Sequence, residues 1–339
     1  ETTASGREAR LRVTDVFEAQ PVILRVGDSI VGTLGNFSAS TGKAKSKKTF
    51  NVCAIVAAAM TGGTVLNYSA FLPTEKRGIL YEDTEQSKFH CKRVLSRILR
   101  LAGLSADVHP AGLEFLCLRG FATKDRLKKI EDAIYEIDGL GLVVIDGIRD
   151  LAHDINSPGE STDLITKLMQ WTDERKIHIH TVLHLNKGDD NTRGHLGTEL
   201  NNKAETVLQI TKDDFDRDIS FVAAMHIRDR DFEPFAFRIN DDALPELVEN
   251  YQPRQSGAAK SFDYAEVCEA KHREALQLLF SEADLVSYSS LIGKLQNSYA
   301  AIGHSFGINK AKQLKVFLEN KRMILKEEKF YRYNPDFHY

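Results

Sequence analysis

The stretch GKAKSKKT, residues 42–49, contains the residue types that bind a phosphate group. A glycine permits a turn that points backbone N–H groups at anionic oxygens, a lysine supplies a cation, and a Ser or Thr hydroxyl suits Mg²⁺. Lys47 stands where such loops usually have a second glycine, at a cost of about 1 kcal/mol if its φ is positive. A basic surface turn is therefore the alternative interpretation. The candidate nucleotide-binding residues are Gly42, Ser46, Lys47, Lys48 and Thr49.

Carboxylates follow two apolar segments further along the chain. Asp146 ends LVVID, at the type of strand end where open α/β sheets bind ligands and where a carboxylate can hold Mg²⁺. Asp83 and Glu85 lie at the end of another expected strand, where a carboxylate can orient the water that attacks a terminal phosphate. If that strand continues, Asp83 and Glu85 share a side and Glu82 faces away. The order of the loop and these acids favours a nucleotide site, with Thr49 and Asp146 as the Mg²⁺ ligands.

Apolar strands and amphipathic helices alternate from residue 29 to residue 185. This alternation predicts an α/β fold with a mostly parallel sheet, which strands in 205–241 extend at one edge. His178 and His180 alternate on one strand without further Cys or His at metal-ligand spacing, so we interpret them as strand residues and not as zinc ligands. The expected helices span 47–60, 87–103, 124–137 and 161–175, and the expected strands span 29–40, 77–86, 112–120, 139–147 and 177–185.

A second, smaller domain is expected after residues 250–262, which we interpret as a linker. Residues 263–339 predict three helices followed by a short β-hairpin, the layout of a winged-helix domain. Between residues 287 and 332 nine Lys and Arg face three acids, so we expect the helix 309–321 to contact a DNA groove. A solvated charged face is the alternative interpretation. The candidate DNA-binding residues of this helix are Lys310, Lys312 and Lys315.

The composition is that of a soluble globular protein, with 42% hydrophobic and 27% charged residues among 339. A formal net charge of −3 excludes a protein that is basic overall, so any nucleic-acid surface must be local. No apolar run approaches the roughly 18 residues that span a bilayer, so no membrane partner is expected. The four cysteines form no CxxC pair, which favours reduced thiols and a cytoplasmic location. Since the chain opens with Glu1, we expect it to be a piece of a longer protein.

With these motifs in place, residues 25–245 resemble the RecA-fold P-loop ATPases. They are most similar to the RepA-like hexameric replicative helicases of plasmids and mobile elements. The resemblance implies a RecA-like ATPase domain in residues 1–249, with residues 42–49 as the Walker A loop and Asp146 as the Walker B acid. It also implies ATP and Mg²⁺ as cofactors.

The same resemblance implies two further residues of the hydrolytic site. Glu85, in DTEQ, would be the catalytic glutamate, and His184 would be the polar residue that senses the terminal phosphate. Such helicases often have two adjacent histidines followed by a lysine at the sensor position. Here Leu185 replaces the second histidine, and Lys187 corresponds only loosely to the lysine.

The segment MHIRDRDFEPFAFRI resembles the stretch with which these helicases reach a neighbouring subunit's nucleotide. It implies a trans-acting arginine finger at Arg228, with Arg230 as the second choice, although His226 stands where many relatives have a lysine. Surface ion pairs with the adjacent aspartates are the alternative. By the same resemblance, the segments 153–161 and 186–203 are expected to be the loops that line the central channel, with an ordinary flexible loop as the alternative for the second. The candidate DNA-binding residues of the second loop are Lys187, Arg193, His195 and Lys203.

Three functions are consistent with these features. The first is an ATP-dependent DNA helicase or DNA-remodelling ATPase of a plasmid or mobile element, acting as a hexameric ring on single- and double-stranded DNA. We favour it over a recombinase because no obvious polymerisation segment precedes the core. The second is a DNA-binding regulator or initiator that uses ATP as an assembly switch, and the third is a metabolic P-loop enzyme such as a kinase.

Overall fold

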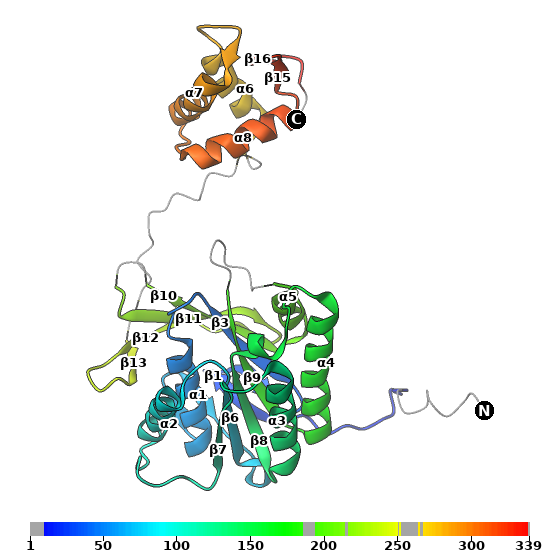
Figure 1. The fold of residues 1–339 in the computed structure, drawn as a ribbon, viewed down its shortest axis with the longest axis vertical. Helices are drawn as coiled ribbons and strands as arrows, with labels where there is room; N and C mark the ends of the chain where they lie inside the picture. Colours follow the sequence, from blue (N-terminus) through cyan, green and yellow to red (C-terminus); the bar gives the residue numbers. More distant parts are fainter. Residues whose placement is uncertain are drawn as a thin grey trace, which may run out of the picture. The chain divides into compact units, whose positions relative to one another are not determined.

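The computed structural model describes residues 10–185, 194–213, 216–249, 251, 264 and 267–337. The chain divides into two compact units, Glu1–Pro253 and Arg254–Tyr339, which are described separately (Figure 1). Within the described ranges, every helix is too short or too polar to span a bilayer. The expected linker, residues 250–262, lies almost entirely outside the described residues.

A nine-stranded sheet, in the order β13-β12-β11-β10-β3-β9-β8-β6-β7, forms the centre of the larger unit. The strands from β10 to β7 in this order are mutually parallel, and the others are antiparallel, which confirms the mostly parallel sheet. The parallel strands are β3 (Phe37–Gly42), β6 (Gly78–Asp83), β7 (Leu113–Cys117), β8 (Leu140–Asp146), β9 (His178–His184) and β10 (Thr206–Lys212). The antiparallel strands are β11 (Ile219–Ile227), β12 (Phe235–Ile239) and β13 (Pro245–Val248).

Helices cover both faces of this sheet (Figure 1). α1 (Lys48–Thr61) and α2 (Lys88–Leu101) pack on one face. α3 (Thr123–Glu136), α4 (Pro158–Arg175) and α5 (Gly194–Lys203) pack on the other, together with the short 3₁₀ turn Ile148–Leu151. Every residue of β8 is buried, as expected for a parallel strand that is covered on both sides.

A second sheet covers α1 on the side away from the main sheet, and the sequence patterns did not predict it. It contains β1 (Val22–Val26), β2 (Ser29–Thr33), β4 (Thr64–Val65) and β5 (Tyr68–Ala70), in the order β2-β1-β5-β4. A 3₁₀ turn, Thr74–Lys76, follows it. Because α1 lies between two layers, ten of its residues are buried, and the helix has no polar face.

α5 also departs from the sequence prediction, which placed a channel loop over residues 186–203. Residues 186–193 lie outside the described residues, but Gly194–Lys203 forms a helix. Leu196 and Leu200, four residues apart, are fully buried in the same hydrophobic cluster as α4. Tertiary packing of this short apolar stripe therefore overrides the low helix propensity of the Gly- and Asn-rich sequence.

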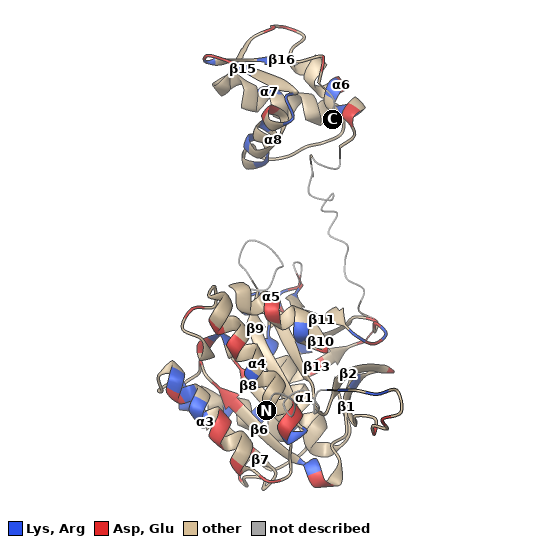
Figure 2. Ribbon diagram, turned by 90° about the vertical axis from the view of Figure 1, so that its right-hand side faces the viewer, with Lys and Arg blue, Asp and Glu red and all other residues tan. Residues whose placement is uncertain are grey.

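The smaller unit has its own hydrophobic core, which includes Leu276, Leu291, Leu314 and Tyr331. As expected, three helices precede a β-hairpin. The helices are α6 (Glu269–Leu279), α7 (Tyr288–Ala301) and α8 (Ile308–Asn320). The hairpin strands are β15 (Ile324–Glu327) and β16 (Phe330–Tyr333), and β14 (Val286–Ser287) joins β16 as a third strand. In Figure 2, blue stretches of the ribbon mark the Lys and Arg residues of α8.

Candidate nucleotide site

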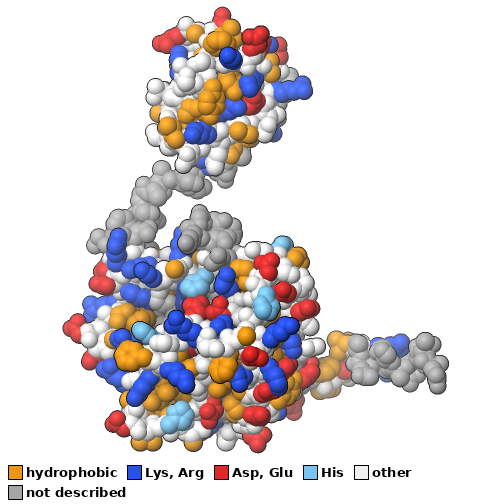
Figure 3. Space-filling model, viewed as in Figure 1, with side chains coloured by type: hydrophobic (Ala, Val, Ile, Leu, Met, Phe, Trp, Pro, Cys, Tyr) orange, Lys and Arg blue, Asp and Glu red, His pale blue; other side chains and the backbone are white. Residues whose placement is uncertain are grey.

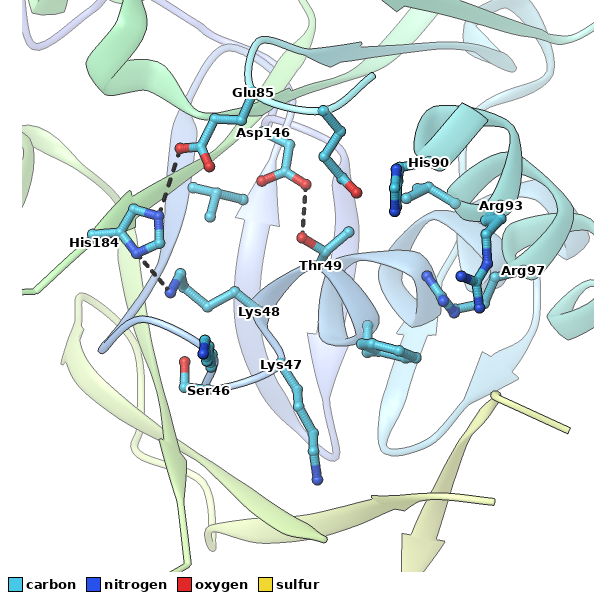
Figure 4. A pocket seen from close by; sticks show the side chains of 15 residues that line it. Ser46, Lys47, Lys48, Thr49, Glu85, His90, Arg93, Arg97, Asp146 and His184 are labelled. Atoms are coloured by element: carbon cyan, nitrogen blue, oxygen red, sulfur yellow. Dashed lines mark hydrogen bonds and ion pairs between the residues drawn. The ribbon is translucent and has the colours of Figure 1, made fainter. Parts of the chain in front are cut away.

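The carboxyl ends of four neighbouring strands bring the candidate site residues together. In the register of the sheet, Gly42 of β3 pairs with His184 of β9, and Asp146 of β8 pairs with Asp83 of β6 and Val182 of β9. A cavity of about 360 Å³ opens at this edge, between the loop after β3 and the start of α2 (Figure 4). Sequence reasoning placed the same strand ends together, because parallel strands share a carboxyl edge.

Gly42 cannot be replaced by a residue with a side chain without moving the loop. A Cβ atom there would lie 2.3 Å from the carbonyl oxygen of Ile210 and 2.5 Å from Ser46 Oγ. The Ser46 hydroxyl lines the cavity, is buried, and has no hydrogen-bond partner among the described residues. A tight loop with an unsatisfied buried hydroxyl, at the N-terminus of α1, is suited to an anionic group such as a phosphate.

Lys47 adopts the left-handed conformation that a second glycine would usually provide. Its φ is 69° and its ψ is 28°, and it immediately precedes α1. Its ammonium group points away from the cavity and donates to the carbonyl oxygens of Arg217, at 3.3 Å, and Asp218 (Figure 4). Lys47 therefore fits the loop at a backbone cost of about 1 kcal/mol, and in this structure it is not a second cation beside Lys48.

Lys48 is the cation inside the cavity. Its Nζ donates to the carbonyl oxygens of Gly42 and Lys43, both at 2.9 Å, and lies 3.1 Å from Nδ1 of His184. Burial lowers the pKa of Lys48 to about 8, while the charges of Asp146 and Glu85 act in the opposite direction. The ammonium group is thus largely removed from water and positioned to interact strongly with an added negative charge.

Thr49 and Asp146 form the oxygen-rich side of the site. Asp146 Oδ2 accepts a hydrogen bond from Thr49 Oγ1 at 3.0 Å and another from the Tyr81 hydroxyl at 2.8 Å. Burial, followed by the charge of Asp83, raises the pKa of Asp146 to about 6. A buried carboxylate whose hydrogen-bond donors are both neutral hydroxyls fits a cation, and a hydroxyl with a carboxylate is a donor set that suits Mg²⁺.

Glu85 and His184 form the opposite wall, where His184 lies between Lys48 and Glu85 (Figure 4). An ammonium group can only donate, so Nδ1 of His184 accepts from Lys48, and Nε2 carries the ring proton. That nitrogen lies 3.5 Å from Glu85 Oε1. The His184 hydrogen bond is the main cause that lowers the pKa of Glu85, with smaller contributions from Lys48 and Arg149. Glu85 is therefore an ionised carboxylate that can accept a proton.

Asp83 has a different role from Glu85, because β6 ends at Asp83 and the expected alternation stops there. Its carboxylate accepts hydrogen bonds from the backbone N–H groups of Glu85, at 3.0 Å, and Gln86, at 2.7 Å. Asp83 thus orders the loop that presents Glu85. Glu82 does not line the cavity; it is fully buried, and burial raises its pKa well above the ordinary value.

One face of α2 completes the cavity, and the sequence prediction missed its contribution. His90, Arg93 and Arg97 line the cavity from three successive turns of this helix. The Arg97 guanidinium lies 3.7 Å from the ring centroid of Phe50 and also donates to the carbonyl oxygen of Ala243. Residues spaced three and four apart lie on one face of a helix, so the sequence of this basic helix could have predicted that these three side chains face the cavity. In Figure 3, basic and histidine side chains surround a small acidic patch on this face.

The candidate finger Arg228 lies at the other end of the sheet. It follows β11, whose last residue Ile227 pairs with Thr206, and Thr206 in turn pairs with Ser38 near the start of β3. The phosphate loop follows the far end of β3, so Arg228 does not reach the cavity of the same chain. Arg228 is exposed and donates to the carbonyl oxygen of Lys203 at 3.0 Å. The second choice, Arg230, is also exposed, two residues further on.

The remaining predicted residues are distributed over several surfaces. Lys187 and Arg193 lie outside the described residues, while His195 and Lys203 are exposed at the two ends of α5. On α8 the lysines differ from one another. Lys312 is exposed, Lys310 lies 4.9 Å from the Tyr264 ring centroid, and Lys315 is largely buried. Lys315 pairs with Glu319 and lies over the rings of Tyr288 and Tyr331.

The two predicted strand histidines lie inside the larger unit, away from the cavity. His178 and His180 hydrogen-bond to the hydroxyl of Ser38 at 2.7 and 2.8 Å, and His180 also bonds to Ser40 at 2.9 Å. Burial lowers the pKa of His178 to about 4 and that of His180 to about 3, so both rings are neutral at physiological pH. This buried network links the side chains of β3 and β9 inside the sheet.

Comparison with known proteins identifies the family. The family described as an AAA domain matches residues 8–190, more than half of the 339 residues. A solved structure titled "Crystal structure of the RadB recombinase" is similar over 63% of this chain and 91% of its own, at 13% sequence identity and a TM-score of 0.45. That likeness is too distant to assign an activity, and no curated protein matches the chain significantly. Because the family match covers more than half of the chain, the chain belongs to the AAA domain family of P-loop ATPases.

Proposed function

We propose that the protein is an ATP-dependent DNA helicase or DNA-remodelling ATPase. The observation that carries this proposal is the convergence of Lys48, Thr49, Asp146, Glu85 and His184 on one cavity. ATP phosphates would lie at the N-terminus of α1, in the loop that Gly42 permits. Thr49 and Asp146 would hold Mg²⁺, which neutralises phosphate charge when bound.

In this proposal Lys48 binds the phosphates and Glu85 acts as the base. Lys48 would leave the carbonyl oxygens of Gly42 and Lys43 to contact the terminal phosphates. Glu85, held ionised by His184, would accept a proton from the attacking water. Because His184 contacts both Lys48 and Glu85, movement of Lys48 toward a phosphate would also change the environment of the base.

The smaller unit supports DNA as the partner. Its three helices and β-hairpin have the order of a winged-helix domain, in which a helix enters the major groove of DNA. α8 would be that helix, with exposed Lys312 and the partly exposed Lys310 facing the phosphates. Single-stranded DNA would contact the region of α5, and the plasmid or mobile-element setting and the cytoplasmic location follow from the resemblance and composition described above.

A ring of subunits, which we propose to be a hexamer, would bring Arg228 to a second nucleotide. Its position at the opposite end of the sheet from its own phosphate loop means that it could act only on a neighbour. Its charge would stabilise the charge that develops on the transferred phosphoryl group. If so, subunits with Arg228→Ala, mixed with Glu85→Gln subunits, should recover part of the ATPase activity that each variant lacks alone.

A forked DNA substrate distinguishes the proposed motor from its alternatives. We expect ATP-dependent strand separation by the wild-type chain, and a fall in kcat of about 10²- to 10⁴-fold for Glu85→Gln with ATP affinity retained. The matched control is Glu75→Gln, in a 3₁₀ turn and outside the residues that line the cavity. Equal losses in both glutamine variants would contradict the role of Glu85.

Two features of the phosphate loop favour the assembly-switch alternative. Lys47 has a left-handed backbone conformation. Lys48 must also break its hydrogen bonds to the carbonyl oxygens of Gly42 and Lys43 before it can contact a phosphate. Both features would slow ATP hydrolysis. A protein that binds DNA in an ATP-dependent manner, hydrolyses ATP slowly and separates no strands would support the switch. Phosphoryl transfer to a small molecule would instead support the metabolic enzyme.

A further inference from the structure

α8 exposes one stripe of uncharged side chains to solvent. Positions four, seven and eleven residues after Asn309 lie on the same side of a helix as Asn309 itself. The stripe comprises four exposed residues, Asn309, Gln313, Val316 and Asn320. The opposite side of the helix packs in the core of the smaller unit through three fully buried residues, Ala311, Leu314 and Leu318. Packing therefore holds α8 with the uncharged stripe facing outward.

The side chains of this stripe match the chemistry of A·T base pairs. A carboxamide, as in Asn309 and Gln313, can accept from N6 and donate to N7 of adenine in the major groove. Val316, which is 50% exposed, offers the kind of apolar contact that suits the methyl group of thymine. Arg and Lys, which form the usual contacts to guanine, do not occur at the four positions of the stripe.

Positive charge lies beside the stripe and at its end. Lys312 is exposed at one side of it, and Lys321 and Arg322 are exposed directly after α8. The acidic side chain of this helix, Glu319, is paired with Lys315. A surface with neutral polar groups along its centre and cations around them fits a DNA groove, where the base edges lie between two rows of phosphates.

We propose that α8 recognises a run of A·T base pairs, with Asn309 and Gln313 bonding to adenine and Val316 contacting a thymine methyl group. The inference rests on the proposed function, in which α8 contacts DNA, and adds which base pairs it selects. From Asn309 to Val316 the helix advances about 10 Å, the length of about three base pairs. Asn320 is expected to contribute less, because such helices contact base edges mainly with their N-terminal residues.

Selection by the smaller unit would direct ATP hydrolysis in the larger unit to particular duplex sites. The test uses the full chain without ATP and a library of duplexes with a randomised centre. The duplexes that it retains should share about three adjacent A·T pairs. Retention of duplexes with no shared sequence, or with a G·C-rich one, would overturn the inference and leave DNA binding intact. Failure to bind any duplex would contradict both the inference and the DNA partner of the proposed function.

Two neighbouring residues of α8 separate base recognition from phosphate contact. Gln313→Ala should lower the affinity for a selected duplex by about tenfold and leave the affinity for unselected duplexes unchanged. Lys312→Ala should lower the affinity for both duplexes by the same factor. The matched control is Gln277→Ala, which removes an exposed glutamine from α6 and should change neither affinity. Equal losses on both duplexes in Gln313→Ala would exclude a base contact by this residue.

A change of specificity tests the same position without a loss of binding. Gln313→Arg should replace an A·T pair by a G·C pair at one position of the selected sequence, because arginine pairs with guanine. Far-UV circular dichroism checks that the variant is folded. An unchanged selected sequence in folded Gln313→Arg would contradict the proposed role of this residue.

Uracil-containing DNA tests the contact of Val316. Uracil lacks the methyl group of thymine, so the wild-type chain should bind a selected duplex several-fold more weakly when uracil replaces thymine. Val316→Ala should bind the two duplexes with nearly equal affinity. Equal binding of both duplexes by the wild-type chain would overturn the assignment of Val316.

Discussion

The nucleotide cavity and the lysine-bearing helix α8 use charge in opposite ways. In the cavity, Lys48, His184 and Glu85 are hydrogen-bonded in series, and Asp146 is buried with Thr49. On α8, Lys312 projects into water by itself. Groups that share contacts in a region of low dielectric act as a unit, whereas exposed charges act separately and weakly. Single substitutions should therefore have large effects in the cavity and small effects on α8.

The largest expected effect separates the two adjacent lysines of the loop. Lys48→Ala should lower ATP affinity by about 100-fold or more, because it removes the buried cation. Lys47→Ala should lower ATP affinity only several-fold, because the Lys47 ammonium group bonds to the turn before β11. Isothermal titration calorimetry with a non-hydrolysable ATP analogue measures both. Unchanged affinity in Lys48→Ala would remove the basis for the phosphate-loop assignment.

A Lys47→Gly variant sharpens this contrast. Glycine relieves the left-handed strain, worth about 1 kcal/mol, while it removes the same side-chain contacts as alanine. If the backbone conformation matters most, Lys47→Gly should bind ATP at least as well as wild type and better than Lys47→Ala. Equal affinities of the glycine and alanine variants would show that the strain does not influence binding.

Asp146→Asn should reveal the free-energy cost of the buried carboxylate. The raised pKa, about 6 against an ordinary 3.8, means that the folded protein binds this proton more tightly than the unfolded chain. Wild-type stability therefore falls as pH rises from about 4 to about 6. Asparagine keeps an acceptor for Thr49 and Tyr81 without the charge, so the variant should gain up to about 3 kcal/mol at pH 7.5.

The pH dependence of the stability difference between Asp146→Asn and the wild type shows whether ionisation of Asp146 causes it. At pH 4.5 Asp146 is protonated in the folded wild type. The stability advantage of Asp146→Asn over the wild type should therefore fall to about 1 kcal/mol. Urea unfolding without added Mg²⁺ at the two pH values gives both numbers. A difference that is the same at both values would mean that packing, and not ionisation, distinguishes the variants.

The site could be predicted from the sequence wherever strand topology alone determines position. Asp146 ends an uninterrupted apolar strand, His184 ends the adjacent strand β9, and Gly42 ends β3 on the other side of β9. A parallel sheet therefore places all three at one edge. The direction of the Lys47 side chain could not be predicted, since it depends on the turn containing Arg217, 170 residues away. The role of Asp83 could not be predicted either, because β6 ends at this residue and its carboxylate accepts a hydrogen bond from the backbone N–H of Glu85.

In the fold, too, the elements with a clear local sequence pattern could be predicted, and those that depend on contacts distant in sequence could not. The alternation of strands and helices predicted the main sheet, and three amphipathic helices with a hairpin predicted the smaller unit. The small sheet over α1 was missed, because β4 and β5 have only two and three residues and no readable alternation. The Gly- and Asn-rich sequence of residues 194–203 predicts a loop, whereas burial of Leu196 and Leu200 against distant residues stabilises the helix α5.

The smallest expected effects compare two lysines of α8. Lys312→Ala should weaken DNA binding only a few-fold and lower the slope of log affinity against log salt by about 1, as for the loss of one phosphate contact. Lys315→Ala should instead lower the free energy of unfolding of the smaller unit by about 1 kcal/mol, because Lys315 packs over Tyr288 and Tyr331. Fluorescence anisotropy at several salt concentrations and urea unfolding measure the two quantities. If Lys315→Ala reduces the salt slope and leaves stability unchanged, the buried lysine is a DNA contact after all, and α8 resembles the cavity more closely than its exposed face indicates.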